Sequence, residues 1–286
     1  MIWCCPWPVD KSRYNIALLA PAGYPHAMAF REVAVLLVAS FESLGIPATF
    51  MLNNLDPAAT NVILGYHLIQ TPSTLRGIRY IPYQLEQLDS ESPFVTERAM
   101  EVLRNATEVW DYSPRNMAHL ASKGVKAKLL PLGYHEKLRL IPQLPESQQD
   151  IDVLHYGTLN PRRQRVLEQL QKVCRLVHVD CLYGEARDAL IARAKLVLSI
   201  HFYESKLPAQ VRISYLLNNG KAVLAEAAGD GVDDPFQGMV GAASYDQLVA
   251  TALELLRDGA RREELAANGL VGFQQRGMAE YLQAVP

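Results

Sequence analysis

Short apolar runs alternate with amphipathic stretches along the first half of the chain. The apolar runs predict strands at residues 14–21, 48–53, 61–68, 78–88, 108–112 and 127–134. Helical periodicity is clearest from His26 to Gly45, where the glycine is a normal helix end, and a second helix follows the strand near residue 110. Strands separated by helices predict βαβ units and a parallel sheet.

The pattern stops at a polar stretch that holds Pro142 and Pro145, and then it starts again. We predict strands at 151–159, 175–180, 195–202 and 221–227, helices at 161–173, 185–194 and 211–220, and a mostly helical remainder. The sequence therefore predicts an α/β protein with two tandem Rossmann-like domains whose parallel sheets face a cleft. The first domain covers residues 1–135, the linker 136–150 and the second domain 151–286, and the last helix is a candidate for returning to the first domain.

Composition narrows the class of protein. The chain has 286 residues, 49% of them hydrophobic and 20% charged, which suits two globular domains. A net charge of −2 argues against broad binding of nucleic acid or anionic membranes. No apolar run is long enough to span a bilayer, and the four cysteines lack zinc-type spacing. We therefore expect reduced thiols and a cytoplasmic protein.

Three arginines, Arg162, Arg163 and Arg165, stand at the start of a predicted helix, where the helix dipole is already positive. Gly157 just before them lets the backbone approach a ligand, and the free N–H groups of Thr158 to Asn160 suit an anion. We predict that Arg162 or Arg163 adds a charge-assisted hydrogen bond to a phosphate. The alternative is an ordinary turn with a solvated basic surface.

Further polar residues follow other predicted strands, and in open parallel sheets ligands bind beyond these strand ends. After the strand at 195–202 and at the start of the next helix stand His201, Tyr203, Glu204, Gln210, Arg212 and Ser214. In the first half, Gly23 permits a tight turn and His26 stands at a helix entrance, where an imidazole can serve as a base. His67, Glu86 and Asp111 follow neighbouring strands. Each of these residues has a structural alternative, as a cap, a buried side chain or a polar loop.

Segments 152–170, 183–204 and 211–226 resemble the C-terminal domain of family 1-type glycosyltransferases of the GT-B class, and the first half resembles their acceptor domain by layout. The resemblance implies a nucleotide-sugar donor held by the second half and an acceptor entering from the first, near Gly23, Tyr24 and His67. It also implies that no metal is needed. His26 resembles the base of some inverting members, with Glu86 and Asp111 in reserve.

One departure from the family concerns an acidic pair found in many retaining members. Aligning Gly220 on the family's turn places Leu207 and Tyr215 where those members carry glutamates, so Glu204 and Glu226 remain as candidates for holding the ribose. We predict a metal-independent glycosyltransferase with an unidentified acceptor, and no cofactor besides the nucleotide sugar as co-substrate. The alternatives are a nucleotide-sugar epimerase of the same fold and a non-catalytic nucleotide-sugar-binding protein.

Overall fold

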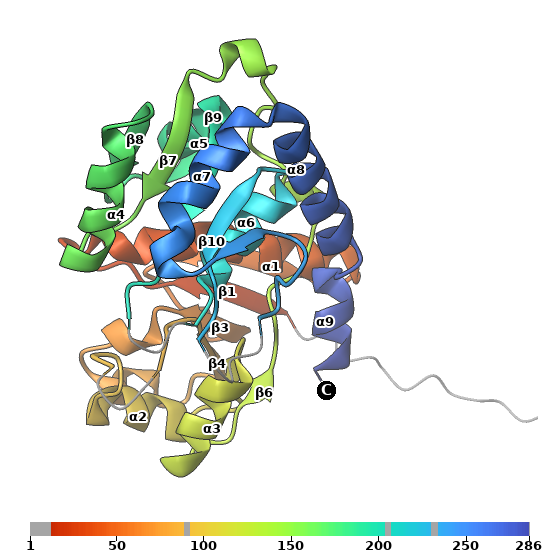
Figure 1. The fold of residues 1–286 in the computed structure, drawn as a ribbon. Coiled ribbons are helices and arrows are strands. Elements are labelled where there is room, and N and C mark those ends of the chain that lie inside the picture. The colour runs from red at the N-terminus through yellow and green to blue at the C-terminus, as the bar shows by residue number, and fades with distance from the viewer. Residues whose placement is uncertain (1–12, 89–91, 204–206, 230–233, 286) are drawn as a thin grey trace, which may run out of the picture.

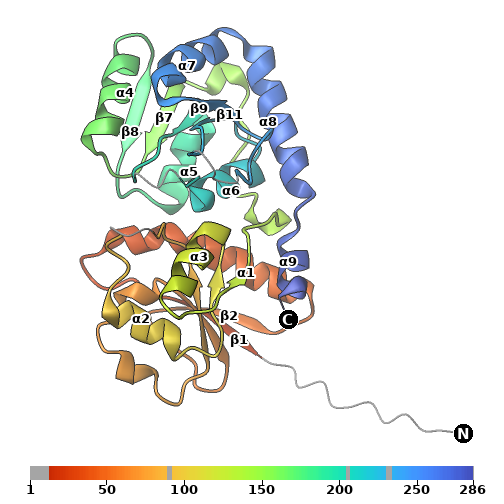
Figure 2. The same cartoon turned by 60° about the horizontal axis from the view of Figure 1, so that its bottom comes forward.

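The chain folds around two parallel sheets, one in each half (Figures 1 and 2). The computed structural model describes residues 13–88, 92–203, 207–229 and 234–285. The first sheet has the order β2-β1-β3-β4-β5-β6 and the second has the order β11-β10-β9-β7-β8. All of the strand pairs are parallel. The predicted fold class, an α/β protein with two parallel sheets, is confirmed.

The strands follow the apolar runs of the sequence. Those of the first sheet are β1 (Tyr14–Leu18), β2 (Ala48–Leu52), β3 (Thr60–Leu64), β4 (Tyr80–Gln84), β5 (Trp110–Asp111) and β6 (Lys128–Leu129). Those of the second are β7 (Ile151–Tyr156), β8 (Leu176–Val179), β9 (Ala194–Ser199), β10 (Val223–Glu226) and β11 (Gly241–Ala243).

The helices connect these strands and cover the sheets. They are α1 (Arg31–Ser43), α2 (Glu97–Arg104), α3 (Pro114–Ser122), α4 (Pro161–Gln171), α5 (Gly184–Arg193), α6 (Gln210–Asn218), α7 (Leu248–Arg257), α8 (Gly259–Gln274) and α9 (Met278–Ala284). Short 3₁₀ turns lie at Pro25–Phe30, Tyr66–Leu68, Pro72–Leu75, Glu136–Leu138, Glu146–Gln148 and Tyr245–Gln247. Within the described ranges, no helix combines the length and the apolar character that crossing a bilayer requires.

Several elements differ from the sequence predictions. The helix predicted from His26 begins as a 3₁₀ turn with Pro25 at its first position and becomes α-helical only at Arg31. The strand predicted at 127–134 pairs over two residues only. The short strand β11 was not predicted, because Gly241–Ala243 carries only small side chains and shows no alternation. Helix α2 was also not predicted, although the side chain of Thr96 caps it by accepting the N–H of Ala99 at 3.1 Å.

The end of the chain returns to the first half. Helix α8 runs down the side of the second half, and α9 packs against α1 (Figure 2). At this junction Tyr134 forms a parallel bridge with Gly277. One apolar cluster continues across both halves and includes Leu37, Ile151 and Met278. The two sheets are therefore joined by packing as well as by the linker.

Gly133 lies where the segment that follows β6 crosses the segment between α8 and α9. A Cβ atom at this position would lie 2.5 Å from the carbonyl oxygen of Arg276 and 2.7 Å from the amide nitrogen of Met278. Because both neighbours are backbone atoms, neither can move without displacing the junction.

We expect Gly133→Ala to lower the free energy of unfolding by about 1–3 kcal/mol through overpacking. Gly277→Ala is the matched control, because the three atoms nearest to a Cβ there belong to the flexible side chain of Glu280. Chemical denaturation of both variants measures the difference. Equal stability of the two variants would contradict the close crossing at Gly133.

Candidate functional site

A cavity of about 420 Å³ lies between the two halves, lined by residues of both. Its walls include the segments that follow β1 and β4 in the first half, and those that follow β7, β8 and β9 in the second. In both sheets the connections change direction beside the first strand, between β1 and β3 and between β7 and β9. Such switch points at the carboxyl ends of parallel strands are where open α/β sheets bind their ligands.

Gly157 forms the turn between β7 and the cavity. Its φ of +112° is rarely adopted by residues with side chains, and a Cβ there would lie 2.6 Å from Nη2 of Arg212. A Cβ at residue 157 would therefore force the Arg212 guanidinium to shift from its present place beside the loop. This arrangement places a cation beside the amide groups that lead into α4, whose first position is Pro161.

Arg212 on α6 lines this part of the cavity. Its Nε and Nη1 atoms are buried and have no hydrogen-bond partner among the described residues. Burial lowers the pKa of Arg212 below its usual value, Tyr156 and Tyr183 act in the opposite direction, and the nearby Arg187 lowers it further. The Tyr156 ring is centred 5.0 Å from the guanidinium carbon, and Tyr156 raises the pKa of Arg212, but this side chain is not an anionic partner. The Arg212 side chain is therefore suited to an anionic ligand.

Arg163 and Arg162, the arginines singled out in the sequence, have protein partners. Arg163 donates to the carbonyl of Ile200 from Nε at 3.0 Å and from Nη2 at 2.6 Å, and to the carbonyl of Thr158 from Nη1 at 2.7 Å. It lines the cavity, and burial together with the nearby Arg212 lowers its pKa to about 9. Arg163 thus holds the loop and adds positive potential.

Arg162 lies outside the cavity lining, so of the two arginines predicted to contact a phosphate only Arg163 borders the cavity. The phosphate contact itself stays a prediction. Its guanidinium makes a two-pronged ion pair with Glu226, in which Nη1 lies 2.6 Å from Oε2. Glu226 also accepts the N–H of His201 at 3.0 Å. Both oxygens of Glu226 are therefore engaged within the protein, and this carboxylate is not available to hold a ribose.

Glu86, just after β4, presents a carboxylate to the cavity from the first half. Its side chain is 22% exposed, and burial raises its pKa to about 7. The imidazole of His67 lies close to it, with Nε2 3.9 Å from Oε1 of Glu86. Because burial lowers the pKa of His67 to about 4, that ring is neutral at physiological pH and does not neutralise the carboxylate. Glu86 therefore titrates in the range that general-base catalysis requires.

The raised pKa of Glu86 predicts how stability depends on pH. A carboxyl whose pKa is higher in the folded than in the unfolded state loses stability as pH rises from about 4.5 to 7. We expect Glu86→Gln to raise the melting temperature more at pH 8 than at pH 4.5. The corresponding gain in the free energy of unfolding should be larger at pH 8 by about 3 kcal/mol at most. Thermal unfolding at both pH values measures this, and an equal change at both would contradict the buried position of Glu86.

Asp111, predicted as a reserve base, lies outside the cavity lining and is fully buried. Its Oδ1 accepts the N–H of Ser113 at 2.7 Å and a side-chain N–H of Asn116 at 3.2 Å, and its Oδ2 accepts from Gln84 at 3.3 Å. Burial raises the pKa of Asp111 to about 8. These contacts hold the turn between β5 and α3, so a catalytic role for Asp111 is not supported.

Other residues singled out in the sequence divide between the cavity and the surrounding structure. The cavity lining contains Tyr24, His26, Glu86, Gly157, Thr158, Arg163, His201, Tyr203, Gln210 and Arg212. Gly23, His67, Asn160 and Ser214 lie outside it. Gly23 is an exposed turn residue, His67 is buried behind Glu86, Asn160 caps α4 by accepting the N–H of Arg163, and Ser214 donates to the carbonyl of Val211. Glu204 lies outside the described residues.

A buried polar network that the sequence reasoning missed joins the two halves beside the cavity. Arg187 on α5 donates to Glu32 of α1 at 3.0 Å and to Asp188 at 2.8 Å. Tyr215, at the position where retaining family members carry a glutamate, donates its hydroxyl to Asp188 at 2.8 Å. Strand-end reasoning cannot find these residues because they lie within helices.

Solved structures of several proteins are similar to this chain over nearly its whole length. A structure of Anabaena HepE in complex with UDP-glucose has a TM-score of 0.54 at 14% identity, covering 95% of this chain and 100% of that chain. AviGT4, a glycosyltransferase involved in avilamycin A biosynthesis, has the same score and identity, with coverage of 95% and 98%. A putative UDP-N-acetylglucosamine 2-epimerase from Listeria monocytogenes gives 0.51 at 12% identity, with coverage of 96% and 95%.

Comparisons of the sequence alone find similarity over only part of the chain. No family model matches the chain. An uncharacterized protein, L140, of Acanthamoeba polyphaga mimivirus is 28% identical over 155 residues, which make up 51% of this chain. The match spans about half of that relative, 50% of its length. Two parallel sheets of six and five strands, together with the structural similarities, show that the chain has the GT-B glycosyltransferase fold.

Proposed function

We propose that the protein is a metal-independent glycosyltransferase that moves a sugar from a nucleoside-diphosphate sugar to an acceptor hydroxyl. The observation that carries the proposal is the buried guanidinium of Arg212, which lies against the Gly157 loop and has two nitrogens that no described residue hydrogen-bonds. A carboxylate that titrates near pH 7, Glu86, lines the same cavity from the other half of the chain.

The donor diphosphate would bind at the Gly157 loop. Backbone N–H groups at the start of α4 and the guanidinium of Arg212 act there as hydrogen-bond donors. When the bond from the anomeric carbon to the diphosphate breaks, the leaving diphosphate gains negative charge. Donors fixed in place before the reaction favour this state more than the bound substrate, and that difference accelerates the reaction. The printed complex of HepE with UDP-glucose makes UDP-glucose the first donor to test.

The acceptor would enter from the first half, beside Tyr24 and Phe94. In an inverting transfer the acceptor hydroxyl gives its proton to the Glu86 carboxylate, and its oxygen forms the new bond to the anomeric carbon. The electrons of the broken bond leave with the diphosphate. We assign the base role to Glu86 rather than His26, because burial adjusts the pKa of Glu86 to about 7 and the described residues offer its carboxylate no ion-paired cation.

An epimerase is the second candidate, supported by the structural similarity to the putative 2-epimerase from Listeria monocytogenes. Incubation with a panel of nucleotide sugars, followed by ion-exchange chromatography of the products, distinguishes the two candidate functions. Release of nucleoside diphosphate supports the transferase, with water as a slow acceptor. Conversion of one nucleotide sugar into another supports the epimerase, and binding without any conversion contradicts both enzymatic functions.

A further inference from the structure

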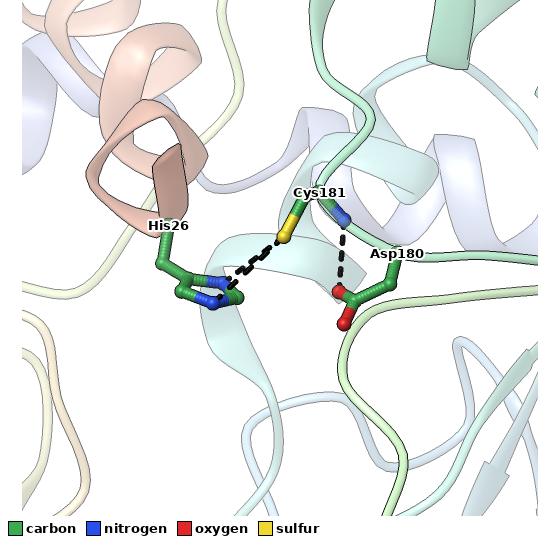
Figure 3. Close-up of side chains that lie close together, drawn as sticks. All are labelled: His26, Asp180 and Cys181. Atoms are coloured by element: carbon green, nitrogen blue, oxygen red, sulfur yellow. Dashed lines mark hydrogen bonds between the residues drawn. The ribbon is translucent and has the colours of Figure 1, made fainter. Parts of the chain in front are cut away.

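Three side chains with metal-binding atoms meet at the edge of the cavity (Figure 3). His26 comes from the 3₁₀ turn before α1, in the first half, and Asp180 and Cys181 come from the loop after β8, in the second half. One ligand atom from each of the three lies within 4.8 Å of the others. Within the described ranges, this is the one group of three or more such side chains that satisfies this distance.

The distance between Cys181 and His26 is close to that of two ligands in a tetrahedral site. The thiol sulfur of Cys181 lies 3.8 Å from both ring nitrogens of His26. Bonds of about 2.3 Å to sulfur and 2.0–2.1 Å to nitrogen at a tetrahedral angle place these two atoms about 3.5 Å apart. Because the sulfur is equally far from both nitrogens, the ring needs only to turn about its Cβ–Cγ bond, a soft torsion, to aim one nitrogen at a shared ion.

Asp180 is already oriented for such a site. Its Oδ1 accepts the N–H of Cys181 at 2.8 Å and the hydroxyl of Thr158 at 3.3 Å. The Asp180 side chain also forms a hydrogen bond with the Cys181 thiol, so the carboxylate faces the sulfur. Outer hydrogen bonds that fix a carboxylate in this way are a regular part of metal sites in proteins. Cys181 itself is held at φ +53°, a conformation uncommon for a residue other than glycine.

The combination of ligands selects the class of metal. A thiolate and an imidazole together suit Zn²⁺ and its spectroscopic substitute Co²⁺, whereas Mg²⁺ and Ca²⁺ require oxygen ligands. Three protein ligands leave a fourth position for water. The ligands come from both halves, so an ion at this site connects them across the cavity.

We propose that His26, Asp180 and Cys181 bind one thiophilic divalent cation of the Zn²⁺ class and that the bound ion closes this edge of the cavity. Metal binding releases the proton of the Cys181 thiol and occupies one lone pair of His26. This regulatory role rests on the proposed function. By linking the two halves, the ion keeps substrates out of the cavity between them and so inhibits sugar transfer. The metal is therefore regulatory, and sugar transfer itself does not use it.

Titration with Co²⁺ tests the binding site without any assay of activity. All proteins in the test are full-length and carry Cys4→Ser and Cys5→Ser, because two adjacent thiols could bind metal by themselves. We expect one equivalent of Co²⁺ to produce a thiolate-to-cobalt absorption band that Zn²⁺ abolishes and Mg²⁺ does not. Loss of outer contacts commonly costs about 10–100-fold in metal affinity, so loss of a ligand in Cys181→Ser or His26→Ala should cost about 100-fold or more.

Cys174→Ser is the matched control, since Cys174 is the other cysteine that the structure describes, and its thiol donates to the carbonyl of Leu170 away from the site. The proposal is overturned if the band persists in Cys181→Ser, disappears in Cys174→Ser or fails to form. Inhibition of nucleotide-sugar turnover by Zn²⁺, absent in Cys181→Ser, tests the regulatory step. Binding of the metal without inhibition would overturn that step alone, and absence of any turnover would count against the proposed function rather than the site.

Discussion

Replacing Glu86 with glutamine should lower the rate of sugar transfer by roughly 10²–10⁴-fold, the usual contribution of a general base. Glutamine keeps the size and polarity of the side chain but cannot accept the proton of the acceptor hydroxyl. Donor affinity should change little, because in our proposal the second half binds the donor. Steady-state kinetics with separate measurement of nucleotide binding checks both expectations.

The pH profile gives this prediction a second readout. The wild-type rate should rise with pH as Glu86 loses its proton near its pKa of about 7, and this limb should be absent in Glu86→Gln. His26→Ala is the comparison, since His26 also lines the cavity and was the first candidate from the sequence. If His26→Ala abolishes turnover while Glu86→Gln retains it, the base is His26 and our assignment is wrong.

Arg212→Met should weaken the binding of a nucleoside diphosphate by about 10–150-fold, because a charge-assisted hydrogen bond to a partly buried anion contributes roughly 1.5–3 kcal/mol. The methionine keeps much of the apolar stem, and removal of an unpaired buried cation should not destabilise the fold. The transfer rate should fall as well, since the same guanidinium stabilises the leaving diphosphate. Calorimetric titration with UDP measures the affinity.

Arg165→Met is the matched control for Arg212→Met. It removes the same charge from the same basic region, but Arg165 is exposed on α4 and lies outside the cavity lining. We expect its effect on UDP affinity to stay within a few-fold. Equal losses in the two variants would mean that the general positive field, and not a specific contact of Arg212, holds the anion.

The sequence predicted the fold well because buried parallel strands and amphipathic helices leave clear patterns. Runs such as residues 14–18 and 151–156 are apolar enough to identify both sheets. Elements without such a pattern, such as β11 with its small residues, could not be found in this way. The polar stretch with Pro142 and Pro145 connects the first sheet to the second. The predicted domain limits at residues 135 and 151 remain predictions.

The site was harder to predict because the role of a side chain depends on its partners. Arg162, Arg163 and Arg212 are equivalent in a sequence reading, yet Glu226 pairs with the first and backbone carbonyls with the second. In the proposed metal site His26 lies 155 positions before Cys181, so the spacing of ligands along the sequence gives no signal for the site. Tertiary structure alone shows which polar groups are satisfied and which are available.

A crystal structure of the protein with bound UDP would show where the diphosphate binds. We expect the diphosphate to lie against the backbone N–H groups that follow Gly157 and to accept hydrogen bonds from the guanidinium of Arg212. If the diphosphate binds at another surface, or leaves Arg212 without contact, Arg212 and the Gly157 loop are not the donor site.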